Sequence, residues 1–301
     1  MARWITNKDR SEVALKIATQ LPTHISSVAG VSRGGIPIAV QIAELIHAHA
    51  YSINKDGELV DLSYGFRLRH KRMEEDGAVL IVDDTIANGT TFKRLKEGLK
   101  FKSFGSRKVY LAAGYVPANM LGTIDFVGDI AELPHYLEWN FFNSVHVQHA
   151  AFDFDGVLCE NCPREMDDDG EQYLKFLRTA RPLYLVRRRS IPLIVTGRLE
   201  KYRQQTLAWL SRYGISVDKL VMGPWKDINE RRRNWSAKEL KGETFKKSHL
   251  KIFVESCPRQ SKEIYSVSGR TVICPTTSTV YSSDDCDTEQ AIADIDSTTY
   301  R

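Results

Sequence analysis

Short runs of β-branched and other apolar residues alternate along the chain with segments whose apolar positions recur at helical spacing. Runs that are apolar on both faces are typical of parallel strands covered by helices on both sides. The pattern therefore predicts an α/β protein built from doubly wound parallel sheets. The runs that we interpret as strands are Ile25–Val31, Val79–Val82, Val109–Ala113, Ile124–Val127, Val147–Phe152, Ile191–Val195 and Ile252–Val254.

Two helices are predicted close to the N-terminus. Residues 6–20 carry apolar positions at helical spacing, and Thr6 or Asn7 suits the N-cap. A second helix is predicted from Ile36 to about His49, because Pro37 is well placed in a first helical turn.

Composition limits the class of protein. A length of 301 residues suggests two domains, each large enough for a core of its own. A net charge of +4 and a pI of about 8.7 fit small anionic substrates and do not favour nucleic acid. No apolar run approaches the ~20 residues of a membrane span, and no signal peptide is recognisable. Five cysteines without a secretory context indicate reduced thiols and a cytoplasmic protein.

Candidate chemistry first arises at the end of the second predicted strand. Asp83 and Asp84 follow Val79–Val82, and Gly89 precedes a helical pattern. Ligands bind at this end of parallel strands, and a helix N-terminus offers free N–H groups to a phosphate. Adjacent carboxylates beside a phosphate cradle suit a ribose phosphate. An ordinary strand–turn–helix junction with surface acids is the alternative.

The stretch V-L-I-V-D-D-T-I-A-N-G-T-T, residues 79–91, resembles the phosphoribosyl-pyrophosphate (PRPP) loop of type I phosphoribosyltransferases. The resemblance implies that Asp83 and Asp84 face the ribose hydroxyls. The residues that would wrap the 5′-phosphate are Ala87, Asn88, Gly89, Thr90 and Thr91. Purine enzymes of this family usually carry an aspartate where Ala87 stands, so this departure leaves open a different acceptor or a domain that binds without reacting.

A second stretch supports this resemblance. Ser32-Arg33-Gly34-Gly35 follows a predicted strand and resembles the family's pyrophosphate loop, which implies that Ser32, Arg33 and Gly34 contact the pyrophosphate. The basic segment 51–77 lies where the family has a mobile lid.

The aromatic segment 134–143 lies where the family has its hood, the piece that covers the nucleobase. The resemblance implies that Tyr136, Trp139 and Phe141 bind the acceptor base. A cluster of aromatic side chains that seals a domain junction is the alternative.

The second half of the chain also places acids after a predicted strand. Asp153 and Asp155 are spaced so that both side chains can point the same way. Such carboxylates can hold Mg²⁺, and one of them can attack phosphorus. The pattern F-D-F-D-G-V-L, residues 152–158, resembles the first motif of the haloacid dehalogenase-like (HAD) phosphohydrolases.

This second resemblance assigns roles to particular residues. Asp153 would be the nucleophile, Asp155 the acid/base, and Thr196 the residue that binds the phosphoryl group. We expect Lys238 to be the family's lysine, with Lys241 and Lys246 as rivals. The expected Mg²⁺ ligands are Asp153, Asp155 and Glu255. Ser256 stands where the family commonly has an aspartate, which weakens the expected metal site.

Two further patterns have less specific interpretations. The runs Arg187–Arg189 and Arg231–Arg233 are interpreted as solvated faces, with phosphate steering as the alternative. About forty residues separate the first two HAD-like motifs, which leaves no room for a large cap domain.

The sequence therefore predicts a phosphoribosyltransferase-like domain at residues 1–145 and a HAD-like Rossmannoid domain without a large cap at 146–275. A partly disordered polar tail is expected at 276–301. The predicted function is bifunctional: transfer of phosphoribosyl from PRPP to a base-like acceptor, and Mg²⁺-dependent hydrolysis of a phosphate ester. A PRPP- or nucleotide-sensing domain that regulates the phosphatase and a non-catalytic interaction protein are the alternatives. The expected partners are small molecules, without a membrane, and assembly into homo-oligomers is left open.

Overall fold

A computed structural model describes residues 2–54, 57–62, 77–87, 89, 92–93 and 104–283. Contacts divide the chain into two compact units, which we call the N-terminal unit, Ile5–His135, and the C-terminal unit, Met1–Trp4 with Tyr136–Arg301. The predicted lid lies largely outside the described residues. Asn88, Thr90, Thr91 and the tail beyond residue 283 also lie outside the described residues.

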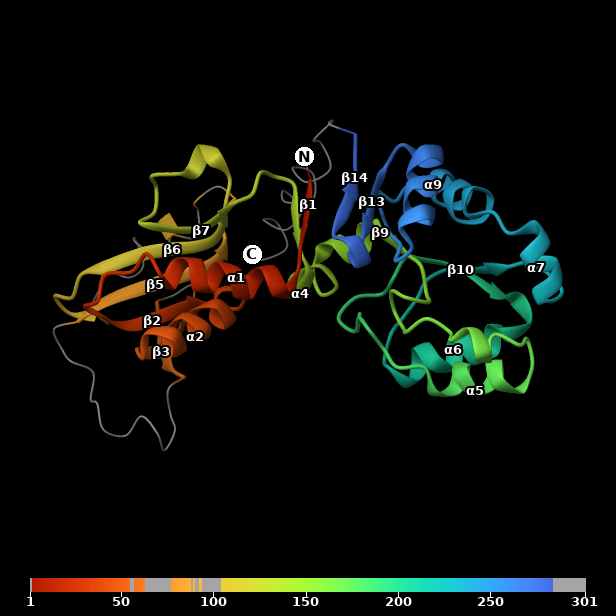
Figure 1. Ribbon diagram of the computed structural model, residues 1–301, viewed down its shortest axis with the longest axis horizontal. Coiled ribbons are helices and arrows are strands. Elements are labelled where there is room, and N and C mark those ends of the chain that lie inside the picture. The colour runs from red at the N-terminus through yellow and green to blue at the C-terminus, as the bar shows by residue number, and fades with distance from the viewer. Residues whose placement is uncertain are drawn as a thin grey trace. The chain divides into compact units, whose positions relative to one another are not determined.

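The N-terminal unit is built on a sheet of six strands in the order β4-β3-β2-β5-β6-β7. Its strands pair in parallel, except that β4 is antiparallel to β3. Figure 1 shows α1 and α2 along this sheet. Its helices and strands are α1 Asn7–Ala18, β2 Ile25–Val31, α2 Gly35–Ile46, β3 His49–Ile53, β4 Leu59–Asp61, β5 Ala78–Thr85, β6 Val109–Val116 and β7 Phe126–Ile130.

The first helix begins where the sequence predicts. Thr6 accepts a hydrogen bond from the Asp9 N–H, and the Asp9 carboxylate accepts one from the Thr6 N–H, which forms a capping box. The second helix ends earlier than predicted, because His47 takes a left-handed conformation with φ of 57°. The chain then enters β3, which the sequence interpretation did not predict, because it assigned the residues from Tyr51 onward to the lid segment.

The C-terminal unit carries a second sheet of six strands, in the order β11-β10-β9-β12-β13-β14. All of its pairs are parallel except β13–β14. Its strands are β9 Ala150–Phe152, β10 Leu193–Leu199, β11 Leu220–Gly223, β12 Ile252–Val254, β13 Thr271–Cys274 and β14 Thr279–Tyr281. Its helices are α4 Glu138–Phe141, α5 Glu171–Thr179, α6 Arg203–Arg212, α7 Ile228–Asn234, α8 Glu243–Lys247 and α9 Pro258–Ser268.

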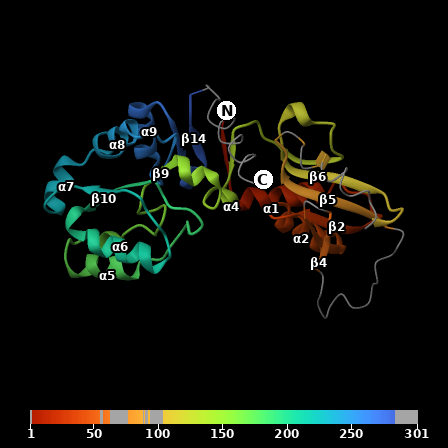
Figure 2. The same ribbon diagram turned by 180° about the vertical axis from the view of Figure 1, so that it is seen from behind.

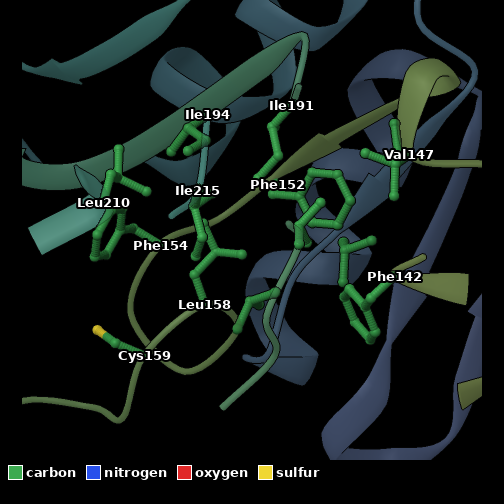
Figure 3. Close-up of a cluster of buried hydrophobic side chains, with 14 of the residues drawn as sticks. Phe142, Val147, Phe152, Phe154, Leu158, Cys159, Ile191, Ile194, Leu210 and Ile215 are labelled. Atoms are coloured by element: carbon green, nitrogen blue, oxygen red, sulfur yellow. The ribbon is translucent and has the colours of Figure 1, made fainter. Parts of the chain in front are cut away.

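Side chains of the second sheet alternate between two cores. Ala150 and Phe152 belong to the larger cluster, which includes α5 and α6, whereas Ala151 belongs to a smaller cluster with Phe245 of α8 and Ile264 of α9. Figure 2 shows these helices from behind, and Figure 3 shows part of the larger cluster around Phe152 and Phe154. Mixed α/β units with mainly parallel sheets are therefore present in both halves of the chain.

Two boundaries differ from the sequence interpretation. β14 pairs with β13, so the second sheet extends beyond residue 275 into the segment predicted as a tail. The aromatic segment after His135 packs with the C-terminal unit, where Tyr136, Phe141 and Phe142 join its hydrophobic cluster. Strands β1, Arg3–Ile5, and β8, His135–Leu137, pair with each other. None of the described helices is long and apolar enough to cross a membrane.

His146 lies within this aromatic cluster. Its ring stacks on Phe141 at 5.5 Å between centroids with an interplanar angle of 13°, and it meets Tyr136 edge-on at 5.5 Å. Burial, followed by the neighbouring His149, lowers the pKa of His146 to about 4. His146 therefore stays neutral in the folded protein at pH values where the unfolded chain binds a proton.

This difference predicts a loss of stability on acidification. As the pH falls below 6.5, the ordinary pKa of histidine, His146 becomes protonated in the unfolded chain but stays neutral in the folded protein. At pH 5 this difference lowers the free energy of unfolding by about 2 kcal/mol. His146→Phe should keep the stacking and remove this term, so its melting temperature should fall less between pH 7 and pH 5 than that of the wild type. Equal losses in both proteins would contradict the prediction.

Candidate functional site

The candidate site of the N-terminal unit lies where β2 and β5 end side by side. The two strands pair in parallel, and the loop after β2 leads through Gly34 into α2. A Cβ atom added to Gly34 would lie 1.9 Å from Oδ2 of Asp84. One added to Gly35 would lie 2.2 Å from the carbonyl oxygen of Val82. Glycine at both positions therefore lets the loop lie against the acidic end of β5.

The two acids of this site are buried beside one another. Asp83 and Asp84 are 8% and 9% exposed, and Oδ1 of Asp83 accepts a hydrogen bond from the Asp84 N–H at 2.9 Å. Burial, followed by the charge of Asp84, raises the pKa of Asp83 well above its ordinary value. The pair thus resists carrying two full charges, and hydroxyl donors or a cation of a ligand would relieve this repulsion.

The remaining described residues of this site are more exposed. Ser32 and Arg33 are exposed after β2, and Ala87 is exposed after β5. Gly89 adopts a φ of +70°, and its carbonyl oxygen accepts a hydrogen bond from the Lys93 N–H at 3.0 Å. Phe92 and Lys93 are helical, which agrees with the helical pattern predicted from Phe92.

The acceptor-binding residues predicted from the aromatic segment lie in different surroundings. Tyr136 and Phe141 are each 1% exposed and belong to the hydrophobic cluster of the C-terminal unit. Their rings meet edge-on at 5.8 Å, and Phe141 also packs against Trp4. Because both rings are buried in the hydrophobic core, neither offers an exposed face on which a base could stack. Trp139 in α4 is half-buried, and its part in acceptor binding stays a prediction.

The candidate site of the C-terminal unit is a cavity of about 460 Å³ at the carboxyl ends of β9, β10 and β12. Asp153 and Asp155 follow β9, Thr196 belongs to β10, and Glu255 follows β12. These four predicted residues all line the cavity, together with Ser256.

Lys241 is the cation at the buried end of the cavity. Its Nζ lies 2.9 Å from Oδ2 of Asp153 and 2.6 Å from Oε2 of Glu255. Lys238, the lysine expected here, is exposed and is not among the residues that line the cavity. A π-helical turn, Lys238–Gly242, carries both lysines, and the three-residue offset places only Lys241 at the acids. The structure therefore favours the rival Lys241 for the charge-neutralising role.

A second cation, Arg198, was not assigned a role from the sequence. Its side chain is 1% exposed and contacts Asp155 with Nη2 2.6 Å from Oδ1 and Nε 2.9 Å from Oδ2. Its guanidinium also lies over the ring of Phe154 at 3.9 Å. An arginine directly after an apolar strand was the only sequence signal for it.

This arrangement does not fit the predicted Mg²⁺ site. Both carboxylate oxygens of Asp155 are held by Arg198, and Lys241 holds one oxygen of Asp153 and one of Glu255. The second oxygen of Glu255 accepts the Cys257 N–H at 2.9 Å. Among the residues that the structure describes, no group of three or more His, Cys, Asp or Glu side chains is arranged to hold a metal ion.

One ammonium shared by two buried carboxylates leaves a surplus of negative charge. Burial, followed by Glu255, raises the pKa of Asp153 to about 8, although Lys241 opposes this shift. Burial alone lowers the pKa of Lys241, but Asp153 and Glu255 outweigh it and raise that pKa overall. Asp153 therefore keeps its proton to a higher pH than an ordinary aspartate does.

Comparisons with known proteins place no established family on the whole chain. No protein-family model matches the sequence, and no curated protein matches it. Among solved structures, a purine phosphoribosyltransferase from Pyrococcus horikoshii shares 20% identity over 46% of this chain and 93% of its own, with a TM-score of 0.36. A Helicobacter pylori xanthine-guanine-hypoxanthine phosphoribosyltransferase shares 16% over the same fractions, with a TM-score of 0.36.

An orotate phosphoribosyltransferase from Aeropyrum pernix shares 17% identity, with a TM-score of 0.31, over 41% of this chain and 70% of its own. At these identities and TM-scores the likeness establishes neither a shared activity nor a shared substrate.

The shifted pKa of Asp153 predicts a particular pH dependence of stability. Because its folded pKa of about 8 lies above its ordinary value of 3.8, the unfolded state loses the proton first, and the contribution to stability falls as the pH rises between these values. Asp153→Asn removes this titration and leaves Lys241 paired with Glu255. The melting temperature of the variant minus that of the wild type should therefore increase from pH 5 to pH 8. A difference that stays constant or shrinks over this range would contradict the assignment.

Proposed function

We propose that the N-terminal unit binds PRPP and transfers its phosphoribosyl group to a base-like acceptor. The observation that carries the proposal is the contact between the Gly34 loop and the Asp84 carboxylate at the ends of two adjacent parallel strands. Buried carboxylates accept hydrogen bonds from ribose hydroxyls, while the backbone of Gly34 and Gly35, where α2 begins, lies beside these carboxylates and suits contact with a phosphate. Ser32 and Arg33 stay exposed beside them for the pyrophosphate.

Transfer would form a bond between C1′ and an acceptor atom and release pyrophosphate. Neither Ala87 nor its neighbour Asn88 can take a proton from the acceptor, so the acceptor would have to be nucleophilic without a base at this position. The same feature supports the alternative of a domain that senses PRPP or a nucleotide. Release of pyrophosphate in the presence of a panel of bases separates transfer from sensing.

Calorimetry with PRPP and Mg²⁺ on the full chain tests the binding. Asp84→Ala should weaken PRPP binding roughly 10- to 100-fold, the range expected for lost charged hydrogen bonds. Gly34→Ala should weaken it similarly with little loss of stability, because the three atoms nearest to the added methyl group all belong to the Asp84 side chain. Gly35→Ala is the matched control and should lower the melting temperature, since its methyl meets backbone. Wild-type protein that fails to bind PRPP would refute this function.

A second candidate function belongs to the C-terminal unit, and the contact of Lys241 with Asp153 favours it. We propose that this cavity binds a phosphate monoester and hydrolyses it through Asp153. The carboxylate forms a bond to phosphorus as the ester oxygen leaves and takes a proton from water, and a second water then releases inorganic phosphate. Lys241 and Arg198 are the buried cations at this position, and no step is assigned to a metal ion.

Hydrolysis of an aryl phosphate by the full chain tests this second function. The rate should rise with pH up to about 8, because Asp153 attacks only as the carboxylate and burial raises its pKa to that value. Asp153→Asn should reduce turnover by orders of magnitude while the protein remains folded. Assays with and without Mg²⁺ show whether an ion rearranges the site. Activity that matches the Asp153→Asn background at every pH would exclude this type of phosphatase.

A further inference from the structure

The cavity of the C-terminal unit is larger than a phosphate group needs. Its volume of about 460 Å³ falls in the range of ~300–1,000 Å³ typical of sites for whole small molecules. Asp153, Thr196, Lys241 and Glu255 form its buried part. The lining also includes the more exposed residues Arg231, Arg232 and Trp235, none of which the proposed hydrolysis uses.

Trp235 presents a fixed aromatic surface in this exposed part. A Cβ atom added to Gly197 would lie 2.8 Å from the six-membered ring of Trp235, so the indole lies directly against the backbone between Thr196 and Arg198. Trp225 packs against the same indole at 5.6 Å with an interplanar angle of 62°. Nζ of Lys241 lies 5.6 Å from the centroid of this half-buried ring, and the part of the ring that lines the cavity is the surface on which a flat ring would stack.

The two arginines leave positive charge beside this ring. Nη2 of Arg231 lies 2.9 Å from Oδ2 of Asp167, and Nη2 of Arg232 lies 3.9 Å from the same oxygen. One carboxylate thus faces two guanidinium groups, of which Arg232 is 60% exposed. Guanidinium groups bind phosphate oxygens through paired hydrogen bonds, so this surplus charge suits a second phosphate.

We propose that the cavity takes a nucleotide with two separate phosphates. The phosphate to be hydrolysed lies at Asp153, the base stacks on Trp235, and the second phosphate contacts Arg231 and Arg232. This inference rests on the second candidate function, and it names the substrate class. It also revises the interpretation of Arg231–Arg233 as a solvated face, because two of the three arginines line the cavity.

Binding to the full chain tests the proposal. Asp84→Ala/Asp153→Asn is the background, which weakens binding at the N-terminal unit and prevents turnover. The probes are adenosine 3′,5′-bisphosphate, adenosine 5′-monophosphate, ribose 5-phosphate and inorganic phosphate, measured by calorimetry. The bisphosphate should bind about 10-fold more tightly than the monophosphate, and the monophosphate about 10-fold more tightly than ribose 5-phosphate.

Arg232→Gln and Arg233→Gln form a matched pair on α7, since only Arg232 lines the cavity. Arg232→Gln should remove most of the preference for the bisphosphate, whereas Arg233→Gln should change no affinity by more than about twofold. Trp235→Leu should weaken binding of both nucleotides about 10-fold and leave ribose 5-phosphate unaffected. Trp235→Phe should restore most of the loss, which separates stacking from a general effect on the fold.

Two kinds of failure are distinguishable. Binding of inorganic phosphate together with equal affinities for ribose 5-phosphate and both nucleotides would overturn the substrate class and leave the phosphate site standing. Equal effects of Arg232→Gln and Arg233→Gln would also overturn it. Failure to bind any of the four probes would remove the second candidate function and this inference with it.

Discussion

The C-terminal unit depends on one buried contact, the ammonium of Lys241 between the carboxylates of Asp153 and Glu255. Buried charges are tolerated only when they are paired, and here a single cation serves two acids from two neighbouring strand ends. The contact joins the π-helical turn that carries Lys241 to the carboxyl ends of the central strands β9 and β12. Burial, followed by the charge of Glu255, raises the pKa of Asp153 even though Lys241 opposes this shift.

Arg198 plays the corresponding role for Asp155. Its bidentate contact engages both oxygens of that carboxylate, and its burial against Phe154 keeps the guanidinium in place. The family resemblance implies that Asp155 acts as the acid/base and binds a metal ion. In the structure, however, both of its carboxylate oxygens already contact Arg198. Side-chain cations stand where the resemblance implies Mg²⁺.

The N-terminal unit also contains a cluster of buried acids, but its surroundings differ. Asp83 and Asp84 are adjacent in sequence, buried, and close to a loop that only glycine allows to come so near. Burial and mutual repulsion raise the pKa of Asp83, whereas in the C-terminal unit Lys241 opposes the corresponding rise at Asp153.

The sequence by itself determined the α/β class, the capped first helix and the strands β2, β5, β6, β7, β9, β10 and β12, because apolar periodicity and capping are local properties. It also placed Asp83, Asp84, Asp153, Thr196 and Glu255 at strand ends, since parallel strands expose only their ends to ligands. Only the tertiary structure decided that Lys241 rather than Lys238 reaches the acids, because that choice depends on the angular offset within one turn of helix. It alone showed that Arg198 neutralises Asp155 and that Tyr136 and Phe141 fill a core, because such contacts join residues that are distant in sequence.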